Sequence, residues 1–323
     1  MLDNFIETIP AQQRTGKNWF QGSADAVYQC QHVISDESPD YVVVFGGDHV
    51  YKMDIRQMLL SHLRKGDDLT VAAIPVSKQE ARAFGVIECD AEGRILAFHE
   101  KVADPPTMPG DDTRCLASMG NYVFSSSKLL AALDADAKDE TSAHDFGRDI
   151  VPTMVKDGQR VRVYDFTKNV VPGEDAEGLG YWRDIGTVDA YFEAQMDLVS
   201  VKPSFNLDAI LGDEGIVAGA RVGMATESMV AQGSIVSGGR IHRSVLSYRV
   251  RVNSFAELEE CILFEDVVVG RHAKVRRAIV DKGVEIPAGT RIGFDAAEDR
   301  RRGFFVSDDG IVVVPKRAKI EPA

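Results

Sequence analysis

Two aspartates stand in sequence contexts that suit a metal ion. Asp48 follows Gly46-Gly47 directly after the apolar run 41–45, and Asp184 lies among aromatic, basic and glycine residues at 181–187. In open α/β sheets, ligands bind outside the carboxyl ends of the strands, where glycines let them approach the backbone. Mg²⁺ prefers hard oxygen ligands, commonly one or two carboxylates beside substrate phosphates. Asp48 and Asp184 would fit a Mg²⁺ ion carrying nucleotide phosphates if the fold brings them together, whereas Asp48 alone would equally fit a turn or a helix cap.

A second group of polar residues lies at strand ends between these aspartates. Glu100 and Lys101 follow a predicted strand at 94–98. Because neighbouring residues of a strand point to opposite faces, we do not expect them to form a mutual ion pair. Glu100 could accept hydrogen bonds from sugar hydroxyls and Lys101 could contact a phosphate, and a solvated charge pair is the alternative. Ser118 begins another strand and could present its hydroxyl to a ligand.

Several other chemistries find no support in the sequence. The seven histidines have no paired metal-ligand spacing, and the four cysteines lie far apart, so neither set predicts a metal site or a disulfide framework. The sequence contains neither G-x-S-x-G nor G-x-x-x-x-G-K-[ST], the motifs of a hydrolase nucleophile elbow and a P-loop. The candidate chemistry is therefore limited to carboxylates, a lysine and hydroxyls.

The overall charge narrows the possible partners. The 323 residues include 37 Lys and Arg against 50 Asp and Glu, a net charge of −13. So acidic a chain is not expected to bind nucleic acid non-specifically or to dock on an anionic membrane, although a local basic pocket for a phosphorylated metabolite remains open. No apolar run approaches the ~20 residues of a membrane span, and the N-terminus lacks the basic region of a signal peptide. We expect a cytoplasmic protein.

Alternating helix and strand signals in the first two-thirds must position these residues. This order predicts an α/β domain with a mostly parallel sheet. The expected strands are 41–45 and 69–76, both buried, the hairpin 86–89 with 94–98, and 120–124; the expected helices are 23–34, one around 58–63 closed by Gly66, and 129–133, with a turn and helix start at 144–147.

From about Gly215 the apolar pattern changes to a period of six. A six-residue period matches neither a helix nor a strand and is typical of a parallel β-helix, in which each aliphatic side chain stacks inside a triangular coil. An ordinary β-rich domain with chance periodicity is the alternative, and three separate runs favour the solenoid. The runs are Met229, Ile235, Ile241; Leu246, Val252, Leu258, Phe264; and Val280, Ile286, Ile292. We therefore expect a domain at 1–200, a linker at 201–214 and a β-helix domain with a C-terminal extension at 215–323.

Taken together, the motifs resemble glucose-1-phosphate adenylyltransferase, also called ADP-glucose pyrophosphorylase, of bacterial glycogen synthesis. The likeness covers nearly the whole chain in order, and the combination of motifs separates this family from thymidylyl-, uridylyl- and guanylyltransferases. The matching segments are 10–14, 18–27, 47–51, 84–86, 100–101, 117–120, 144–149, 181–187 and, in the solenoid, 250–255. The resemblance implies a Rossmann-like nucleotidyltransferase domain followed by a left-handed parallel β-helix.

The resemblance also implies an activity and roles for the polar residues. The reaction is that of ATP with α-glucose 1-phosphate to give ADP-glucose and pyrophosphate, with Mg²⁺ held by Asp48 and Asp184. Lys101 would act with these two aspartates in catalysis and, together with Glu100, would bind the glucose and its phosphate. Members of the family are normally homotetramers whose C-terminal domain contributes to oligomer contacts and to allosteric control by small phosphorylated or nucleotide effectors.

Three further positions follow from the resemblance. Gly85 and Ser118 would line the sugar-nucleotide pocket. Phe20 stands where the family often has tyrosine, a change that keeps the stacking area and loses the phenolic hydroxyl.

The sequence departs from the family pattern at its start and in its linker. It begins where the family is already within the catalytic domain, without the first strand and the glycine-rich loop that cradles the ATP phosphates, so we expect a truncated domain that binds sugar nucleotide weakly and does not catalyse. After Pro203 the linker is shorter than the family's. The alternative function is a non-catalytic regulatory or assembly subunit, and a solenoid acyltransferase lacks a supporting histidine context. Upstream DNA that encodes the loop in frame would show that the start is misplaced.

Overall fold

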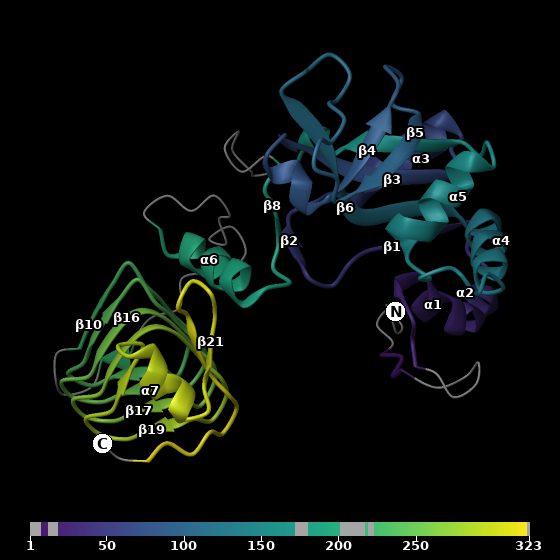
Figure 1. Ribbon diagram of the computed structural model, residues 1–323. Helices are drawn as coiled ribbons and strands as arrows, with labels where there is room; N and C mark the ends of the chain where they lie inside the picture. Colours follow the sequence, from purple (N-terminus) through teal and green to yellow (C-terminus); the bar gives the residue numbers. More distant parts are fainter. Residues whose placement is uncertain (1–7, 12–18, 172–179, 201–216, 219–222, 322–323) are drawn as a thin grey trace. The chain divides into compact units, whose positions relative to one another are not determined.

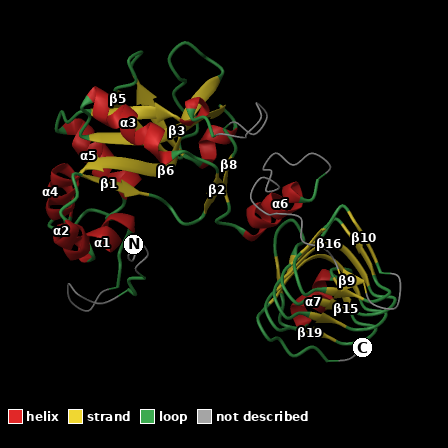
Figure 2. Ribbon diagram, turned by 180° about the vertical axis from the view of Figure 1, so that it is seen from behind, coloured by secondary structure: helices red, strands yellow, loops and turns green. Residues whose placement is uncertain are grey.

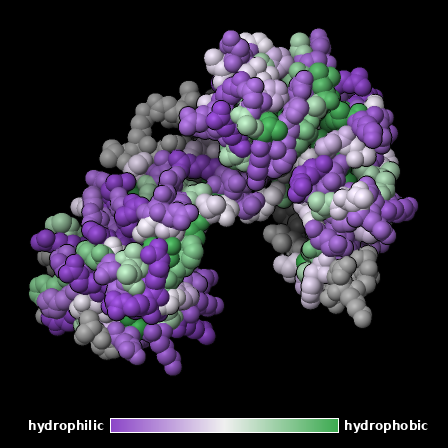
Figure 3. All heavy atoms as spheres, viewed as in Figure 1, coloured by the Kyte–Doolittle hydropathy of each residue, from purple (hydrophilic) through white to green (hydrophobic). Residues whose placement is uncertain are grey.

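The computed structural model describes residues 8–11, 19–171, 180–200, 217–218 and 223–321 (Figure 1). The chain divides into two compact units, which are described separately below. The first comprises Met1–Gly47 with Met53–Pro172, and the second comprises Asp48–Lys52 with Gly173–Ala323. On the face seen in Figure 3, hydrophilic residues predominate over both units. Within the described ranges, no helix is long and apolar enough to cross a membrane.

A six-stranded mixed sheet is the centre of the first unit. Its strands follow the order β5-β4-β6-β3-β7, with β1 paired to β6. Only β3 and β7 pair in parallel, whereas the pairings of β6 with β1, β3 and β4 and of β4 with β5 are antiparallel. The strands are β1 (Tyr41–Val44), β3 (Leu69–Ser77), β4 (Gly85–Cys89), β5 (Ile95–Glu100), β6 (Arg114–Ser125) and β7 (Val161–Asp165).

Helices lie on both faces of this sheet (Figure 2). The alternation of β3 sends Leu69 and Val71 into the main core, where they meet apolar residues of α1, α4, α5 and the π-helical turn η2. On the other face, His62 of α3 contacts Thr70 of β3, with 2.9 Å between Nδ1 and Oγ1. The helices are α1 (Ser23–Gln29), α2 (Gln31–Glu37), α3 (Ile55–Lys65), α4 (Ser126–Asp136) and α5 (Val151–Lys156), with the short helical turns η1 (Glu80–Ala83), η2 (Phe146–Ile150) and η3 (Phe166–Lys168).

Most of the expected elements of this unit are confirmed. The buried strand at 69–76, the hairpin, the strand at 120–124 and the helix around 58–63 are all present, and Gly66 ends that helix in the left-handed conformation with φ 62°. Asp145 caps η2, accepting hydrogen bonds from the backbone N–H groups of Gly147 and Arg148 at 2.9 and 3.0 Å. The predicted turn and helix start at 144–147 is therefore correct.

Three expectations about this unit were wrong. The sheet is mostly antiparallel rather than mostly parallel, because β6 runs antiparallel to β1, β3 and β4, and β4 forms a hairpin with β5. The strand at 41–45 is not buried on both faces: β1 alternates between exposed and half-buried residues, and β6 is its partner among the described strands. The expected helix at 23–34 is divided at Cys30 into α1 and α2.

The second unit contains a parallel β-solenoid, as the six-residue period predicts. Its coils stack strands in register at intervals of mostly seventeen residues, so that Ile241 pairs with Leu258, Leu258 with Val275, and Val275 with Ile292. The strands are β9 (Val217–Ala218), β10 (Met224–Thr226), β11 (Met229–Val230), β12 (Ile235–Val236), β13 (Arg240–His242), β14 (Val245–Leu246), β15 (Arg251–Val252), β16 (Glu257–Leu263), β17 (Val268–Val269), β18 (Lys274–Val280), β19 (Glu285–Ile286), β20 (Arg291–Ile292), β21 (Phe305–Val306) and β22 (Val312–Val314).

The seventeen-residue coil corrects the predicted interior of the solenoid. Three repeats of six would take eighteen residues, one more than a coil contains. Positions counted strictly every six residues are therefore displaced by one residue at one corner of each coil. Leu263 therefore faces the interior in place of Phe264, and Val236 in place of Ile235. Met229 and Phe264 pack instead in a cluster outside the coil. The other seven predicted positions are buried in the interior, as expected.

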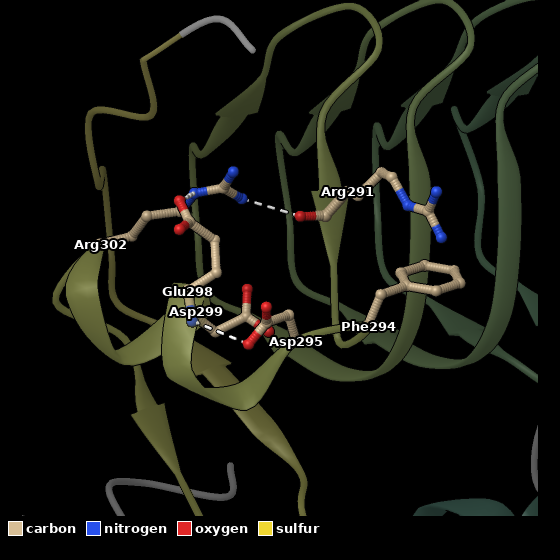
Figure 4. A pocket seen from close by; sticks show the side chains of 6 residues that line it. All are labelled: Arg291, Phe294, Asp295, Glu298, Asp299 and Arg302. Carbon is tan, nitrogen blue, oxygen red and sulfur yellow. Dashed lines mark hydrogen bonds and ion pairs between the residues drawn. The ribbon is translucent and has the colours of Figure 1, made fainter.

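Two helices and a two-stranded ribbon complete the second unit. Helix α6 (Val188–Leu198) packs against the outer cluster, and β2 (His49–Tyr51) pairs with β8 (Trp182–Asp184). Helix α7 (Ala296–Arg301) lies against the last coil, where Arg302 donates a hydrogen bond to the carbonyl oxygen of Arg291 at 2.7 Å (Figure 4). The boundary predicted at 201–214 lies outside the described residues.

Two adjacent valines of β17 test the interior of the solenoid. Val269 is fully buried in the coil and Val268 is half-buried on the outside. Val269→Ala should lower the free energy of unfolding by about 2–3 kcal/mol, because it removes buried methyl groups and leaves a cavity. Val268→Ala should cost less than about 1 kcal/mol. Urea unfolding measures both, and equal losses would contradict the assignment of interior and exterior.

Candidate active site

The β2–β8 ribbon brings together the two aspartates predicted to bind metal. The strands pair antiparallel, with His49 opposite Asp184 and Tyr51 opposite Trp182. The N–H of Ile185 donates to the carbonyl oxygen of Asp48 at 2.9 Å, which extends the pairing by one residue. Backbone hydrogen bonds between distant parts of the sequence therefore determine where both carboxylates lie.

Asp48, His49 and Asp184 form a cluster that could hold a cation. Each offers one ligand atom, and these atoms lie within 4.8 Å of one another. The side chain of Asp48 is 64% exposed, so its carboxylate is open to a ligand. Asp184 is also exposed, and its Oδ1 accepts a hydrogen bond from the N–H of Gly186 at 2.7 Å, which fixes the carboxylate beside the backbone. The sequence-based expectation that Asp48 and Asp184 lie together agrees with this geometry.

His49 is the member of this cluster that the sequence analysis missed. Its Nε2 lies 3.6 Å from Oδ1 of Asp48, and its ring lies 5.2 Å from that of Trp182, measured between centroids. Its Nδ1 is buried without a hydrogen-bond partner among the described residues. Histidine spacing gives no sign of this residue, because its relevant neighbour in sequence is an aspartate.

Glycines leave room for both groups of polar side chains. A Cβ added at Gly186 would lie 3.0 Å from Oδ1 of Asp184 and 3.6 Å from Oδ2 of Asp48. A Cβ added at Gly85 would lie 2.5 Å from the ring of Phe98 and 2.9 Å from Oε2 of Glu100. The ring of Phe98 thus leaves no room for a Cβ at Gly85, whereas a methyl group at Gly186 would press on the carboxylate of Asp184 and touch that of Asp48.

Glu100 and Lys101 lie closer together than strand alternation predicts. Glu100 ends β5 opposite Gly85, and Lys101 adopts a left-handed conformation with φ 50°. This backbone turn interrupts the alternation, so Lys101 Nζ lies 4.0 Å from Oε1 of Glu100. The expectation that the two cannot pair was therefore wrong. The side chain of Lys101 is 65% exposed and that of Glu100 is 39% exposed, so both remain available to a ligand.

Ser118 lies in a distorted part of β6, close to a buried tyrosine. The pairing with β3 shifts register between Val71 and Ala73, and Gly120 has φ 67° there, while its N–H donates to Ser118 Oγ at 3.3 Å. Burial raises the pKa of the Tyr122 hydroxyl above its usual value, and the hydrogen bond with Ser118 opposes this shift. Negative charge on Asp145 and Glu100 adds to the increase in the pKa of Tyr122. Tyr122 was expected only as part of a strand.

The remaining predicted segments give less information. Phe20 is half-buried just before α1, next to Trp19, which is 61% exposed. Residues 12–14 of the predicted motif lie outside the described residues. The aspartate cluster belongs to the second unit, whereas Phe20, Gly85, Glu100, Lys101 and Ser118 belong to the first.

Two protein families match this chain. Residues 3–201 match the nucleotidyl transferase family, and residues 216–314 match the family described as GlmU-like, C-terminal hexapeptide. The protein is a nucleotidyltransferase with a C-terminal hexapeptide solenoid. Several glucose-1-phosphate adenylyltransferases are similar to nearly the whole of this chain. The one from Anaeromyxobacter sp. (strain Fw109-5) is 52% identical, with 100% of this chain and 82% of the relative aligned.

Two more relatives support the same assignment. The glucose-1-phosphate adenylyltransferases of Frankia casuarinae and Deinococcus radiodurans are 49% and 44% identical, and the alignments cover 99% and 98% of this chain and 81% and 80% of the relatives. The chain belongs to the glucose-1-phosphate adenylyltransferase family. The resemblance inferred from the motifs and the predicted order of a nucleotidyltransferase domain and a β-helix are confirmed.

The two glycines that flank the aspartate cluster allow a matched test of cation binding. Gly186→Ala should weaken Mn²⁺ binding about tenfold or more, because the new methyl group would contact both carboxylates. Gly47→Ala, where a Cβ would meet nothing within 4 Å, should leave the Mn²⁺ affinity within about twofold. Depletion of the free-Mn²⁺ electron paramagnetic resonance signal measures both affinities. Equal affinities in the two variants would show that a methyl group beside Asp184 does not disturb binding of the ion.

Proposed function

We propose that the protein transfers the adenylyl group of ATP to α-glucose 1-phosphate, forming ADP-glucose and pyrophosphate for glycogen synthesis. Membership of the glucose-1-phosphate adenylyltransferase family supports the substrates and products. The single observation that carries the proposal is the convergence of Asp48 and Asp184 on the β2–β8 ribbon. Two exposed carboxylates held side by side by backbone pairing suit a reaction between phosphate groups.

The donor set of the cluster fits Mg²⁺. Asp48 and Asp184 supply the hard oxygen ligands that this ion prefers. Gly186 has no side chain that could press on their carboxylates. When bound, Mg²⁺ supplies charge neutralisation and alignment of the phosphate oxygens. His49 contributes a nitrogen, a softer ligand, and we assign it the role of holding Asp48 through their 3.6 Å contact.

The reaction itself requires no covalent intermediate with the protein. An oxygen of the glucose 1-phosphate phosphate forms a bond to the α-phosphorus of ATP, and the bond from that phosphorus to the leaving pyrophosphate breaks in line. Catalysis of this kind is mainly positioning and electrostatic stabilisation. Lys101 would bind the phosphate of glucose 1-phosphate and keep its attacking oxygen in place, since an exposed ammonium group can pair with phosphate.

The remaining groups of the first unit would bind the sugar. Glu100, on the strand opposite Gly85, would accept hydrogen bonds from glucose hydroxyls. Ser118 would line the same pocket, and Phe20 would supply an apolar surface for stacking. These roles come from the family resemblance, and the close packing at Gly85 is consistent with them.

The biological setting forms part of the same proposal. We propose a cytoplasmic homotetramer whose activity responds to small phosphorylated or nucleotide effectors. The net charge of −13 is consistent with small-molecule partners rather than with nucleic acid. A non-catalytic subunit of the same enzyme system is the alternative function, and the following experiment distinguishes the two.

Pyrophosphate release from ATP, Mg²⁺ and glucose 1-phosphate tests the proposed activity. Asp48→Asn and Asp184→Asn should each lower kcat by about 10²-fold or more, because a neutral amide cannot replace a carboxylate ligand. Asp266→Asn is the matched control, since Asp266 is an exposed partner of Arg249 on the solenoid, and its turnover should stay within about twofold. The sequence-based expectation that the chain does not catalyse predicts the opposite result, and no pyrophosphate release by the unmodified protein would support that expectation and favour the non-catalytic subunit.

Lys101 provides an independent test of the sugar-phosphate site. Lys101→Ala should raise the KM for glucose 1-phosphate about tenfold to a hundredfold and change the KM for ATP far less, because it removes one charge-assisted hydrogen bond. Lys78→Ala is the control, since Lys78 pairs with Asp104 elsewhere in the same unit. Steady-state kinetics measures both constants, and equal changes for the two substrates would mean that Lys101 has a structural role.

A further inference from the structure

Helix α6 connects the candidate metal site to the solenoid by a short path. It begins at Val188, only four residues after Asp184, and Thr187 caps its N-terminus by accepting a hydrogen bond from the N–H of Ala190 at 3.1 Å. The link between site and helix consists of Ile185, Gly186 and Thr187. The N–H groups of the first two donate to Asp48 and Asp184, respectively. A displacement of the start of α6 would therefore move the N–H groups that bond to the backbone of Asp48 and to the carboxylate of Asp184.

The apolar face of α6 packs on the outer surface of the solenoid. Phe192 and Met196, one turn apart on the helix, are 3% and 7% exposed and lie in one cluster with Ile262, Ile279 and Ile311. These isoleucines come from strands or turns of three successive parts of the solenoid. The helix is therefore fixed along its length by apolar contacts.

A hydrogen bond fixes the first turn of α6 to the solenoid. The hydroxyl of Ser307, in the turn between β21 and β22, donates to Oδ1 of Asp189. The same hydroxyl oxygen accepts from the N–H of Ile311 at 3.0 Å, and the N–H of Ser307 donates to the carbonyl oxygen of Ile311 at 3.0 Å. Ser307 is 6% exposed and Asp189 is half-buried, so the bond between them is partly shielded from water.

Arg277 of the solenoid supports this contact from one side. The guanidinium of Arg277 lies 5.7 Å from the centre of the Phe192 ring and donates to the carbonyl oxygen of Asp309 at 3.1 Å, in the same turn as Ser307. Arg277 also pairs with Glu260 at 3.4 Å. The turn that carries Ser307 is thus held in place by bonds to the body of the solenoid.

We infer that Ser307 and Asp189 are positioning residues for the candidate metal site, so that the solenoid holds Asp184 in place through α6. Neither residue lies in the Asp48–His49–Asp184 cluster, and both act through the helix start. This inference rests on the proposed function, because it requires Asp184 to bind the cation. The solenoid would then help to position a metal-binding residue and would not be only a separate domain.

Mn²⁺ binding measured without turnover tests this inference. Ser307→Ala should raise the Kd for Mn²⁺ about three- to tenfold, and Asp189→Ala should do the same, because each removes the bond that fixes the start of α6. The variant that combines Ser307→Ala and Asp189→Ala should bind Mn²⁺ as tightly as either single variant, since both substitutions remove the same hydrogen bond. Asp189→Asn keeps an acceptor oxygen and should stay within about twofold of the unmodified protein.

Turnover provides a second readout. The Mg²⁺ concentration for half-maximal rate should rise in Ser307→Ala, while the KM for glucose 1-phosphate stays within about twofold. Ser234→Ala is the matched control: Ser234 is a 2% exposed serine of the solenoid whose hydroxyl donates to the carbonyl oxygen of Ser247 and accepts from the N–H of Val250. It should lower thermal stability and leave the Kd for Mn²⁺ within about twofold. If Ser307→Ala does not fold, the half-buried Asp189 gives the same test through Asp189→Ala.

The outcomes separate this inference from the proposed function. Asp184→Asn should abolish Mn²⁺ binding, and unchanged binding in that variant would overturn both the metal site and the inference. If Asp184→Asn abolishes binding while Ser307→Ala and Asp189→Ala bind as the unmodified protein does, the metal site stands and the inference is overturned. An equal loss in Ser234→Ala would also overturn it, because the effect would then reflect general destabilisation of the solenoid.

Discussion

The antiparallel pairing of β2 with β8 is the constraint on which the candidate site depends. Backbone hydrogen bonds set His49 opposite Asp184 and continue to Asp48 through the N–H of Ile185. Strand pairing fixes positions to within a residue, because a slip by one would turn every side chain to the other face. Two exposed carboxylates, which would otherwise repel each other, are held close by this pairing, and a bound cation would relieve the repulsion.

The solenoid buries its aliphatic side chains by repeating one coil. Each coil of seventeen residues buries its aliphatic side chains inward, and left-handed residues at one corner, Arg243, Glu260 and Arg277, recur at the same interval. Their side chains form an alternating ladder, with Glu260 2.9 Å from Arg243 and 3.4 Å from Arg277. Charge pairing across successive coils thereby offsets part of the strain of left-handed conformations in non-glycine residues. The regular stack gives α6 a flat apolar surface.

Local patterns predicted the elements well, and failed where distant segments decide the outcome. The run 69–76, the hairpin and the period of six were sufficient because burial and turn chemistry act within a few residues. The mostly antiparallel sheet was not predictable, because an apolar run does not specify the direction of its partner. Likewise, the outward positions of Met229 and Phe264 follow from the seventeen-residue coil, and the cluster in which they pack includes residues of α6.

The pair Glu100–Lys101 shows why strand alternation could not predict how these two side chains lie. Strand β5 ends at Glu100, and Lys101 then takes φ 50°, a conformation that costs about 1–2 kcal/mol for a non-glycine residue. Its N–H donates to the carbonyl oxygen of Phe84 at 3.2 Å, so the turn is held by the neighbouring segment. The result is an exposed carboxylate and an exposed ammonium group 4.0 Å apart, which would suit the proposed binding of hydroxyls and a phosphate of one small molecule.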